Sequence, residues 1–212
     1  MLVNFGKANL VDKAFQQPEK VKQVIEKVNA DGLIPTLNAV QSKLNQPIPL
    51  GYSNVGRVIE VGDKVRDFKE GDLVVSNGPH AEIVLVSKNL CAKLPININE
   101  EEAVFTVISS IALQGIRLSN PSLGETFLVS GLGLIGLITA QILASQNCIV
   151  LGIDPDKRKC DIAQSLGIKT LNLANCEEPL SWIIENSNNI GIDGAIITAS
   201  TSSSEPVHLA AK

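Results

Sequence analysis

A glycine-rich turn between an apolar strand and an apolar helix constrains this chain more than any other feature. The segment reads Phe127-Leu-Val-Ser-Gly131-Leu-Gly133-Leu-Ile-Gly136 and continues into an apolar run with helical character. Eighteen residues after Gly136, a second apolar run that starts at Cys148 ends in Asp154. A strand, a Gly-x-Gly-x-x-Gly turn, a helix and a second strand with a terminal acid predict a βαβ unit that binds a dinucleotide.

Each residue of this pattern has a physical role in such a unit. Gly131 allows the tight turn, Gly133 lets the backbone approach a pyrophosphate, and Gly136 lets the helix pack closely on the strand. The helix N-terminus offers free N–H groups to the phosphates. Asp154 can accept hydrogen bonds from a ribose 2′-hydroxyl and would repel a 2′-phosphate, which favours NAD over NADP. A βα unit that binds nothing is the alternative interpretation.

Composition narrows the class of protein. The 212 residues are enough for one large or two small domains, and 44% of them are hydrophobic. A net charge of −4 and a pI near 5.2 argue against nucleic acid as a partner. No unbroken apolar run of about 18 residues predicts a membrane span. The N-terminal segment lacks the apolar core of a signal peptide, so we expect a cytoplasmic protein.

The pattern of cysteines and histidines argues against a metal site. No two cysteines have C-x-x-C spacing, and only two histidines could add imidazole ligands. Disulfides are not expected in this context. The residues concerned are Cys91, Cys148, Cys160, Cys176, His80 and His208.

The first half of the chain changes character near residue 50. Apolar spacing predicts helices before that point, and short β-type runs separated by turn residues follow it, as in part of a small β-barrel. Three consecutive glutamates then favour the start of another helix. The expected helices are 18–31, 37–44 and 100–118, and the expected strands are 55–61, 72–75 and 81–86.

From Phe127 onward, strands and helices alternate, which predicts a doubly wound parallel sheet. The expected strands are 127–130, 149–153, 170–173 and 195–198. The expected helices are 135–145, 157–166, 179–186 and one that starts near Pro206.

Several ordered motifs together resemble those of the medium-chain dehydrogenases/reductases, the zinc-type alcohol dehydrogenase-like superfamily. Leu50-Gly-Tyr-Ser-Asn-Val-Gly56-Arg-Val-Ile-Glu-Val-Gly62 is similar to the family's barrel motif, and the stretches 61–75 and 77–84 continue it. With the glycine turn and Asp154, the resemblance covers about residues 50–212. The first fifty residues look like the bacterial two-domain oxidoreductase branch that is fused to a second dehydrogenase domain.

The resemblance implies a fold and a set of cofactor-binding residues. The implied fold is α/β: a partial GroES-like β-barrel in residues 1–118, with the N-terminal and linking helices, and a Rossmann sheet in residues 119–212. The pyrophosphate would lie on the glycine turn, the adenosine ribose on Asp154 with Lys159 beside it, and the crevice wall would follow the fourth strand. The implied NAD-binding residues are Ser130, Gly131, Leu132, Gly133, Leu134, Ile135, Gly136, Asp154, Lys159, Thr198, Ala199 and Ser200.

The chain departs from the zinc-dependent members of the family. These members have a His-Glu pair after the glycine of the barrel motif, where this chain has Tyr52 and Ser53, and no cysteine precedes Cys91. The usual Lewis acid is therefore not expected. Tyr52 could donate a proton, although packing is the plainer interpretation. Packing is also the plainer interpretation of Thr106, Ser109 and Ser110 on the linking helix, so the catalytic residues stay unassigned.

The resemblance also implies a fragment of a longer enzyme. The family's barrel begins with strands that would precede Met1, and its sheet would gain two strands after Lys212. The fourth strand would then be an apolar edge, which invites pairing with another chain. We therefore expect either self-association or association with a fused or separate dehydrogenase domain.

Three functions stay open from the sequence. The first is a zinc-independent oxidoreductase that moves hydride between NAD(H) and a small-molecule carbonyl or activated alkene. The second is a non-catalytic dinucleotide-binding module, or an inactive fragment of a longer dehydrogenase. The third is a defunct gene product that does not fold stably.

Overall fold

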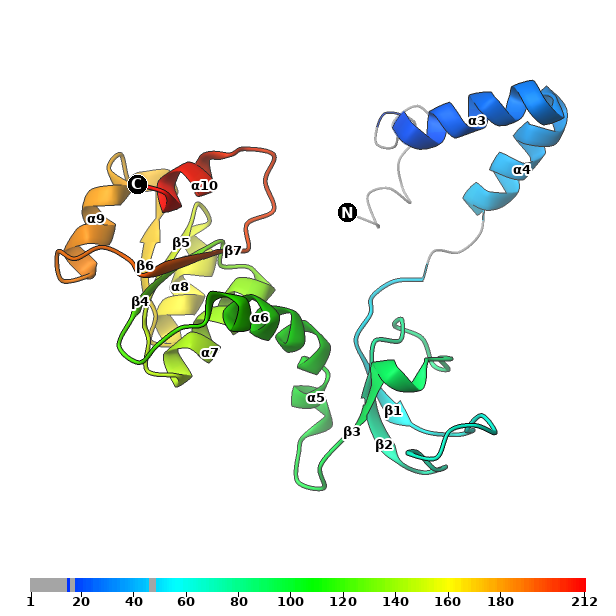
Figure 1. The fold of residues 1–212 in the computed structure, drawn as a ribbon, viewed down its shortest axis with the longest axis horizontal. Helices are drawn as coiled ribbons and strands as arrows, with labels where there is room; N and C mark the ends of the chain where they lie inside the picture. Colours follow the sequence, from blue (N-terminus) through cyan, green and yellow to red (C-terminus); the bar gives the residue numbers. More distant parts are fainter. Residues whose placement is uncertain (1–14, 16–17, 46–48) are drawn as a thin grey trace.

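The computed structural model describes residues 15, 18–45 and 49–212, which form a helical hairpin, a small antiparallel sheet and a larger parallel sheet with helices (Figure 1). This order confirms the predicted α/β class, with a small barrel-type sheet before a doubly wound sheet. No helix in the described part of the chain is long and apolar enough to cross a membrane.

The hairpin consists of α3 (Pro18–Asp31) and α4 (Leu33–Asn45), which pack against each other. Gly32 separates them at a φ of +89°, a conformation that glycine adopts without strain. The end of α3 agrees with the prediction, whereas α4 begins four residues before the predicted 37. Pro35 lies in the first turn of α4, where its missing N–H breaks no helical hydrogen bond.

The small sheet has the order β1-β2-β3, with both pairs antiparallel. Its third strand is Cys91–Lys93, and the predicted strand 81–86 is wrong. Here β1 and β3 take both edges of β2, the segment 81–86 pairs with none of the three strands, and Ile83 and Leu85 stay exposed. The predicted strand 55–61 is also shortened. The strands are β1 (Asn54–Arg57), β2 (Leu73–Ser76) and β3 (Cys91–Lys93), with a short 3-10 helix η1 (Lys88–Leu90) before β3.

Two helices, rather than the single predicted one, link the sheets. Helix α5 (Glu100–Ala103) begins at Asn99, whose side-chain oxygen accepts the Glu101 N–H at 2.9 Å. The chain turns at Val104 and Phe105 and continues as α6 (Thr106–Ser119). Helix α6 packs against α7 of the parallel sheet and also touches β2 and β7.

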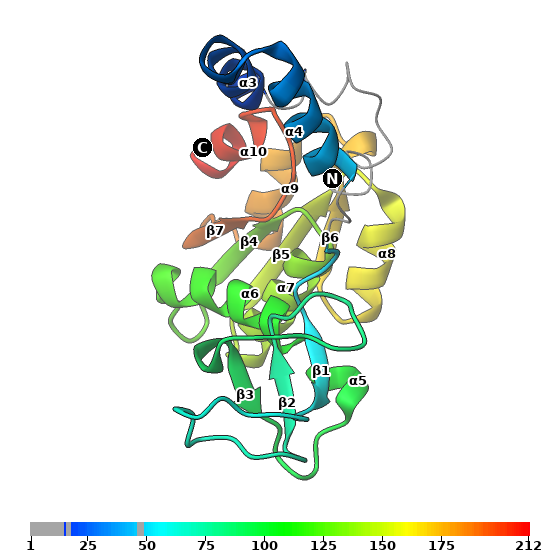
Figure 2. The same ribbon diagram turned by 90° about the vertical axis from the view of Figure 1, so that its right-hand side faces the viewer.

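The parallel sheet has the strand order β6-β5-β4-β7, which confirms the predicted doubly wound sheet and puts β4 between β5 and β7 (Figure 2). Its strands are β4 (Thr126–Ser130), β5 (Ile149–Asp154), β6 (Lys169–Asn172) and β7 (Gly194–Ile197). The helices are α7 (Leu134–Ser145), α8 (Lys157–Ser165), α9 (Pro179–Asn186) and α10 (Glu205–Ala210), with a short 3-10 helix η2 (Leu173–Asn175).

Alternation along the strands builds a core on each face of this sheet. Phe127 and Val129 point to the face that α6, α7 and α8 cover, and Leu128 points to the face of α9 and α10. All five residues of β4 are buried because helices lie on both faces. The sheet therefore holds the carboxyl ends of its strands in fixed positions, where the glycine turn follows β4.

Candidate functional site

A pocket of about 960 Å³ opens at the carboxyl ends of the parallel strands. Eight of the twelve residues that the sequence assigns to a cofactor line it: Ser130, Gly131, Gly133, Asp154, Lys159, Thr198, Ala199 and Ser200. In open parallel sheets, ligands bind at this edge. A smaller hollow of about 530 Å³ lies at the exposed loop 61–70 of the small sheet and contains none of the predicted residues.

The three motif glycines have different surroundings. A Cβ on Gly131 would lie 2.6 Å from the Ala199 backbone nitrogen, and this glycine has a φ of +100°. A Cβ on Gly136 would lie 1.9 Å from the Gly131 carbonyl oxygen, so only glycine lets α7 approach the turn. At Gly133 nothing lies within 4 Å of the Cβ position. Gly133 therefore borders open space on the pocket side, as a phosphate cradle requires.

Helix α7 begins at this open position without a side chain that caps it. Gly133 is its N-cap residue and has no side chain to accept the first-turn N–H groups. These donors and the positive end of the helix dipole are therefore available to an anion. The residues present fit the diphosphate of a dinucleotide.

Asp154, at the end of β5, is 97% buried and has protein partners on both carboxylate oxygens. Oδ2 accepts the Leu132 N–H at 2.8 Å, and Oδ1 accepts the Asp156 N–H at 2.8 Å. The Lys159 ammonium lies 3.4 Å from Oδ2 and 3.5 Å from Oδ1. The carboxylate therefore ties the glycine turn to β5 in addition to lining the pocket.

Thr198, directly after β7, contacts the other side of the same turn. Its hydroxyl donates to the Gly131 carbonyl at 2.6 Å, and its backbone N–H donates to the Ser130 carbonyl at 2.8 Å. The glycine turn is thus hydrogen-bonded to both strands that flank β4: to β5 through Asp154, and to the end of β7 through Thr198.

Four predicted residues do not line the pocket: Leu132, Leu134, Ile135 and Gly136. The Leu132 side chain is fully buried in the core that α7 covers, and only its N–H faces Asp154. Leu134 is half exposed on α7. Gly136 packs against the Gly131 carbonyl oxygen, so it faces the turn rather than the pocket.

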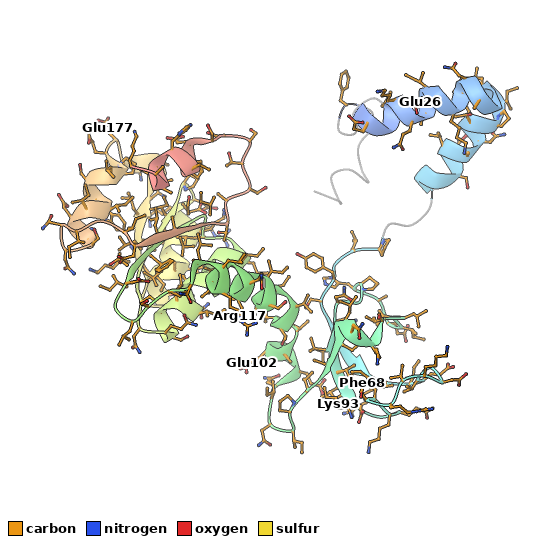
Figure 3. The ribbon with its side chains drawn as sticks, in the orientation of Figure 1. Glu26, Phe68, Lys93, Glu102, Arg117 and Glu177 are labelled. Atoms are coloured by element: carbon orange, nitrogen blue, oxygen red, sulfur yellow. The ribbon has the colours of Figure 1, made fainter. Side chains whose placement is uncertain are left out.

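The far wall of the pocket comes from residues that the sequence analysis did not single out. They follow β6, from η2 through the segment 176–178 to the start of α9, or lie on α10 after β7. The signal was available, because both segments leave the carboxyl ends of parallel strands. They include Leu173, Ala174, Cys176, Glu177, Glu178 and His208. Glu177 lies at the end of the sheet remote from the small sheet (Figure 3).

Three of the candidate side chains near the small sheet and on the linking helices donate hydrogen bonds to backbone carbonyls. The Thr106 hydroxyl donates to the Ala103 carbonyl and the Ser110 hydroxyl to the Val107 carbonyl, each at 2.7 Å. Ser53 donates to the Val104 carbonyl, and Tyr52 is half exposed. These contacts agree with packing roles for the two α6 hydroxyls.

Among the described residues, no three His, Cys, Asp or Glu side chains gather in a way that could hold a metal ion. Cys176 lines the pocket, and the buried Cys160 lies beside Asp154, with its Sγ donating to the Asp154 carbonyl at 3.4 Å. Burial raises the pKa of the Cys160 thiol, so it stays protonated at neutral pH.

Comparison with known proteins agrees with this architecture. Residues 21–96 match the model of the alcohol dehydrogenase GroES-like domain. D-guloside 3-dehydrogenase of Escherichia coli (strain K12) is 35% identical over 122 residues, which cover 56% of this chain and 35% of that protein. This chain thus aligns with about a third of that relative.

Solved structures share the fold. The structure of 2R,3R-butanediol dehydrogenase from Bacillus subtilis matches with a TM-score of 0.66 at 23% identity, covering 77% of this chain and 55% of that one. A mycobacterial protein solved with NADPH matches with a TM-score of 0.61 at 24% identity, covering 73% and 51%. The motifs, the paired sheets and these similarities agree, and the chain resembles the medium-chain dehydrogenase/reductase family in sequence and in fold.

Proposed function

We propose that this chain binds NAD(H) in the pocket at the carboxyl ends of β4, β5 and β7, as the nucleotide half of an oxidoreductase. The family uses NAD(P). The observation that carries the proposal is the glycine turn, with open space at Gly133 and an uncapped α7 N-terminus at the pocket wall. Asp154 beside the ribose position favours NAD over NADP, because a 2′-phosphate would approach its carboxylate.

The proposed reaction is hydride transfer between the nicotinamide and a small carbonyl compound or activated alkene. The cofactor supplies the hydride chemistry, and the chain supplies the phosphate cradle, the ribose contact and the wall formed by Thr198, Ala199 and Ser200. We propose that the reaction is zinc-independent, because Tyr52 and Ser53 stand where zinc-type members carry His and Glu. Metal analysis of the purified protein should then find less than one zinc per chain, and stoichiometric zinc would contradict this part.

A titration with NADH, with NADPH as comparator, tests the binding. Trp182 on α9 is the only tryptophan, and α9 contributes Pro179 and Leu180 to the pocket. Energy transfer from Trp182 to bound nicotinamide should therefore saturate, at lower concentration for NADH than for NADPH. Absence of saturable binding by folded protein would contradict the proposal.

Substitution of Gly133 by a charged residue is the most selective variant for this test. Gly133→Asp keeps a good N-cap residue in a position with room for a side chain, so the fold should persist. Its carboxylate would repel the diphosphate, and we expect the Kd for NADH to rise at least about tenfold. Gly62→Asp is the matched control, because nothing lies within 4 Å of that Cβ position either and Gly62 is outside the pocket.

A non-catalytic dinucleotide-binding module is the second candidate function. It is favoured by the local bonding of Thr106 and Ser110, whose hydroxyls donate to backbone carbonyls three residues earlier in the linking helices. Oxidation of NADH with a panel of aldehydes, ketones and enones distinguishes the two. Turnover supports the oxidoreductase, and tight binding without turnover supports the module.

A further inference from the structure

The peptide group between Gly131 and Leu132 is bonded on both of its polar atoms by side chains from different strands. Its carbonyl oxygen accepts the Thr198 hydroxyl at 2.6 Å, and its N–H donates to the Asp154 carboxylate at 2.8 Å. Thr198 follows β7 and Asp154 ends β5, so the two partners approach from opposite sides of β4. The sequence analysis assigned both side chains to the cofactor alone.

We propose that Asp154 and Thr198 are positioning residues that hold this peptide, and with it the glycine turn, in the phosphate-binding conformation before any nucleotide arrives. This inference deepens the proposed function and rests on it for its biological purpose. Gly131 has a φ of +100°, and as a glycine it has many alternative conformations available in the absence of these bonds. Fixing the peptide in advance removes an ordering cost from nucleotide binding.

Burial strengthens the bond between the Leu132 N–H and Asp154, whereas the Thr198 bond is partly buried. Asp154 is 97% buried, and Leu132 is fully buried, so water competes poorly for the N–H and the carboxylate. Lys159 sits 3.4 Å from Oδ2 and compensates the charge that the carboxylate brings into the interior. The first turn of α7 presses on the same carbonyl, because Gly136 approaches it too closely to admit a Cβ.

The bonds to this peptide also fix the orientation of the backbone on either side of it. The Gly131 N–H donates to the Ile153 carbonyl at 2.8 Å, so two consecutive N–H groups of the turn point toward β5. The turn then reaches Gly133, where the pocket is open. A rotated Gly131–Leu132 peptide would lose both side-chain bonds and would reorient the backbone that enters Gly133.

Hydrogen–deuterium exchange of the protein without nucleotide tests the inference directly. Asp154→Ser and Thr198→Val each remove one of the two side-chain bonds to this peptide, and we expect exchange of the Leu132 amide to become at least about tenfold faster in each variant. Amides in the middle of β4 should keep their exchange rates, which separates loss of positioning from loss of global stability. Unchanged Leu132 exchange in folded Thr198→Val would overturn the inference.

Two controls lie beside these residues. Asp156→Asn alters the cap of α8, where Asp156 accepts the Arg158 N–H, and Thr201→Val removes a hydroxyl that accepts the Ser203 N–H. Neither side chain bonds to the turn in these contacts, so Leu132 exchange should be unaffected. Acceleration by the controls equal to that of Asp154→Ser and Thr198→Val would count against the specific clamp.

Binding of ADP-ribose distinguishes this inference from the proposed function. ADP-ribose lacks the nicotinamide, so Thr198→Val should weaken it severalfold only if Thr198 positions the phosphate turn. Faster Leu132 exchange with unchanged ADP-ribose affinity would overturn the positioning role. Failure of the wild-type protein to bind ADP-ribose or NADH would contradict the proposed function, while the exchange rates would still decide whether the clamp exists.

Discussion

At the scale of single residues, Gly133 and Gly136 belong to one motif but tolerate substitution differently. Gly136 packs its Cα against the Gly131 carbonyl, whereas Gly133 borders open space. The place of each glycine in the motif predicted this difference, because Gly133 was assigned to the pyrophosphate and Gly136 to close helix packing. The difference depends on how closely α7 approaches the turn.

A methyl group added at these positions should therefore have opposite results. Gly136→Ala places a Cβ 1.9 Å from a backbone oxygen and should cost about 2 kcal/mol or more of unfolding free energy. Gly133→Ala should leave the unfolding free energy within about 0.5 kcal/mol of the wild type. Urea denaturation measures both, and equal destabilisation by the two variants would contradict the described geometry.

An ion pair in the small sheet gives a pH-dependent prediction. Lys93 on β3 lies 2.8 Å from Asp72 and 5.8 Å from the centre of the Phe68 ring (Figure 3). The hydrogen bond from Lys93, followed by that from the Lys69 backbone N–H, lowers the pKa of Asp72. A carboxyl with a lowered folded-state pKa stabilises the fold above its ordinary pKa and loses this contribution as the pH falls through the lowered value.

Asp72→Asn should therefore destabilise the protein at neutral pH and have a diminishing effect in acid. Urea denaturation of both proteins across this range gives the difference in unfolding free energy at each pH. Lys88 and Asp67, an exposed pair at 3.7 Å, provide the comparison, and Asp67→Asn should have little effect at any pH. A difference between wild type and Asp72→Asn that grows toward acid would contradict the assigned cause.

At the scale of elements, local patterns predicted the parallel sheet well and the small sheet poorly. Strands β4 and β5 are buried apolar runs, β6 and β7 are partly buried, and all four are bounded by turns and helices, so the local sequence is enough to predict each strand. The segment 81–86 has a strand-like composition too, but a strand also needs a partner, and this segment pairs with none of β1, β2 and β3. Pairing depends on distant residues, and composition does not report it.

The glycine turn and Asp154 were predictable because they follow a fixed spacing. Of these residues, Gly131, Gly133 and Asp154 line the pocket. The wall from η2 and α9 was missed because its residues share no motif; only their place after β6 brings them to the pocket. The internal bonds of Asp154 and Thr198 were also not predictable, since they depend on side-chain distances across three strands.

The unpaired segment 81–86 gives a prediction at this scale. Leu85 is fully exposed, so Leu85→Ser should change the unfolding free energy by less than about 0.5 kcal/mol. Leu151→Ala, in the buried centre of β5, should cost about 2–5 kcal/mol. Thermal and urea denaturation measure the two variants side by side, and a large loss for Leu85→Ser would mean that the segment packs in a strand after all.

At the scale of the whole molecule, the described part of the parallel sheet ends in β7, which pairs there with β4 only. Its far edge offers backbone N–H and C=O groups beside Ile197, which is 40% exposed. Edges of this kind pair with other strands. We therefore expect self-association of this chain that increases with concentration.

Light scattering after size-exclusion chromatography tests that expectation. Ile197→Lys adds a charge to the edge and should raise the fraction of monomer. Ile190→Lys is the matched control, because Ile190 is more exposed than Ile197 and lies before β7. A monomer at every concentration, or an equal response of both variants, would argue against β7 as the contact.

The bond from Thr198 to the Gly131 carbonyl has a consequence for synthesis on the ribosome. A nascent chain that has exposed β4, α7 and β5 already contains the complete glycine motif and Asp154. It lacks the partner of the Gly131 carbonyl until β7 has emerged and crossed beside β4, 67 residues later in the sequence. Chain elongation should therefore set the earliest moment at which the emerging protein can capture a nucleotide, and capture should begin abruptly rather than grow with chain length.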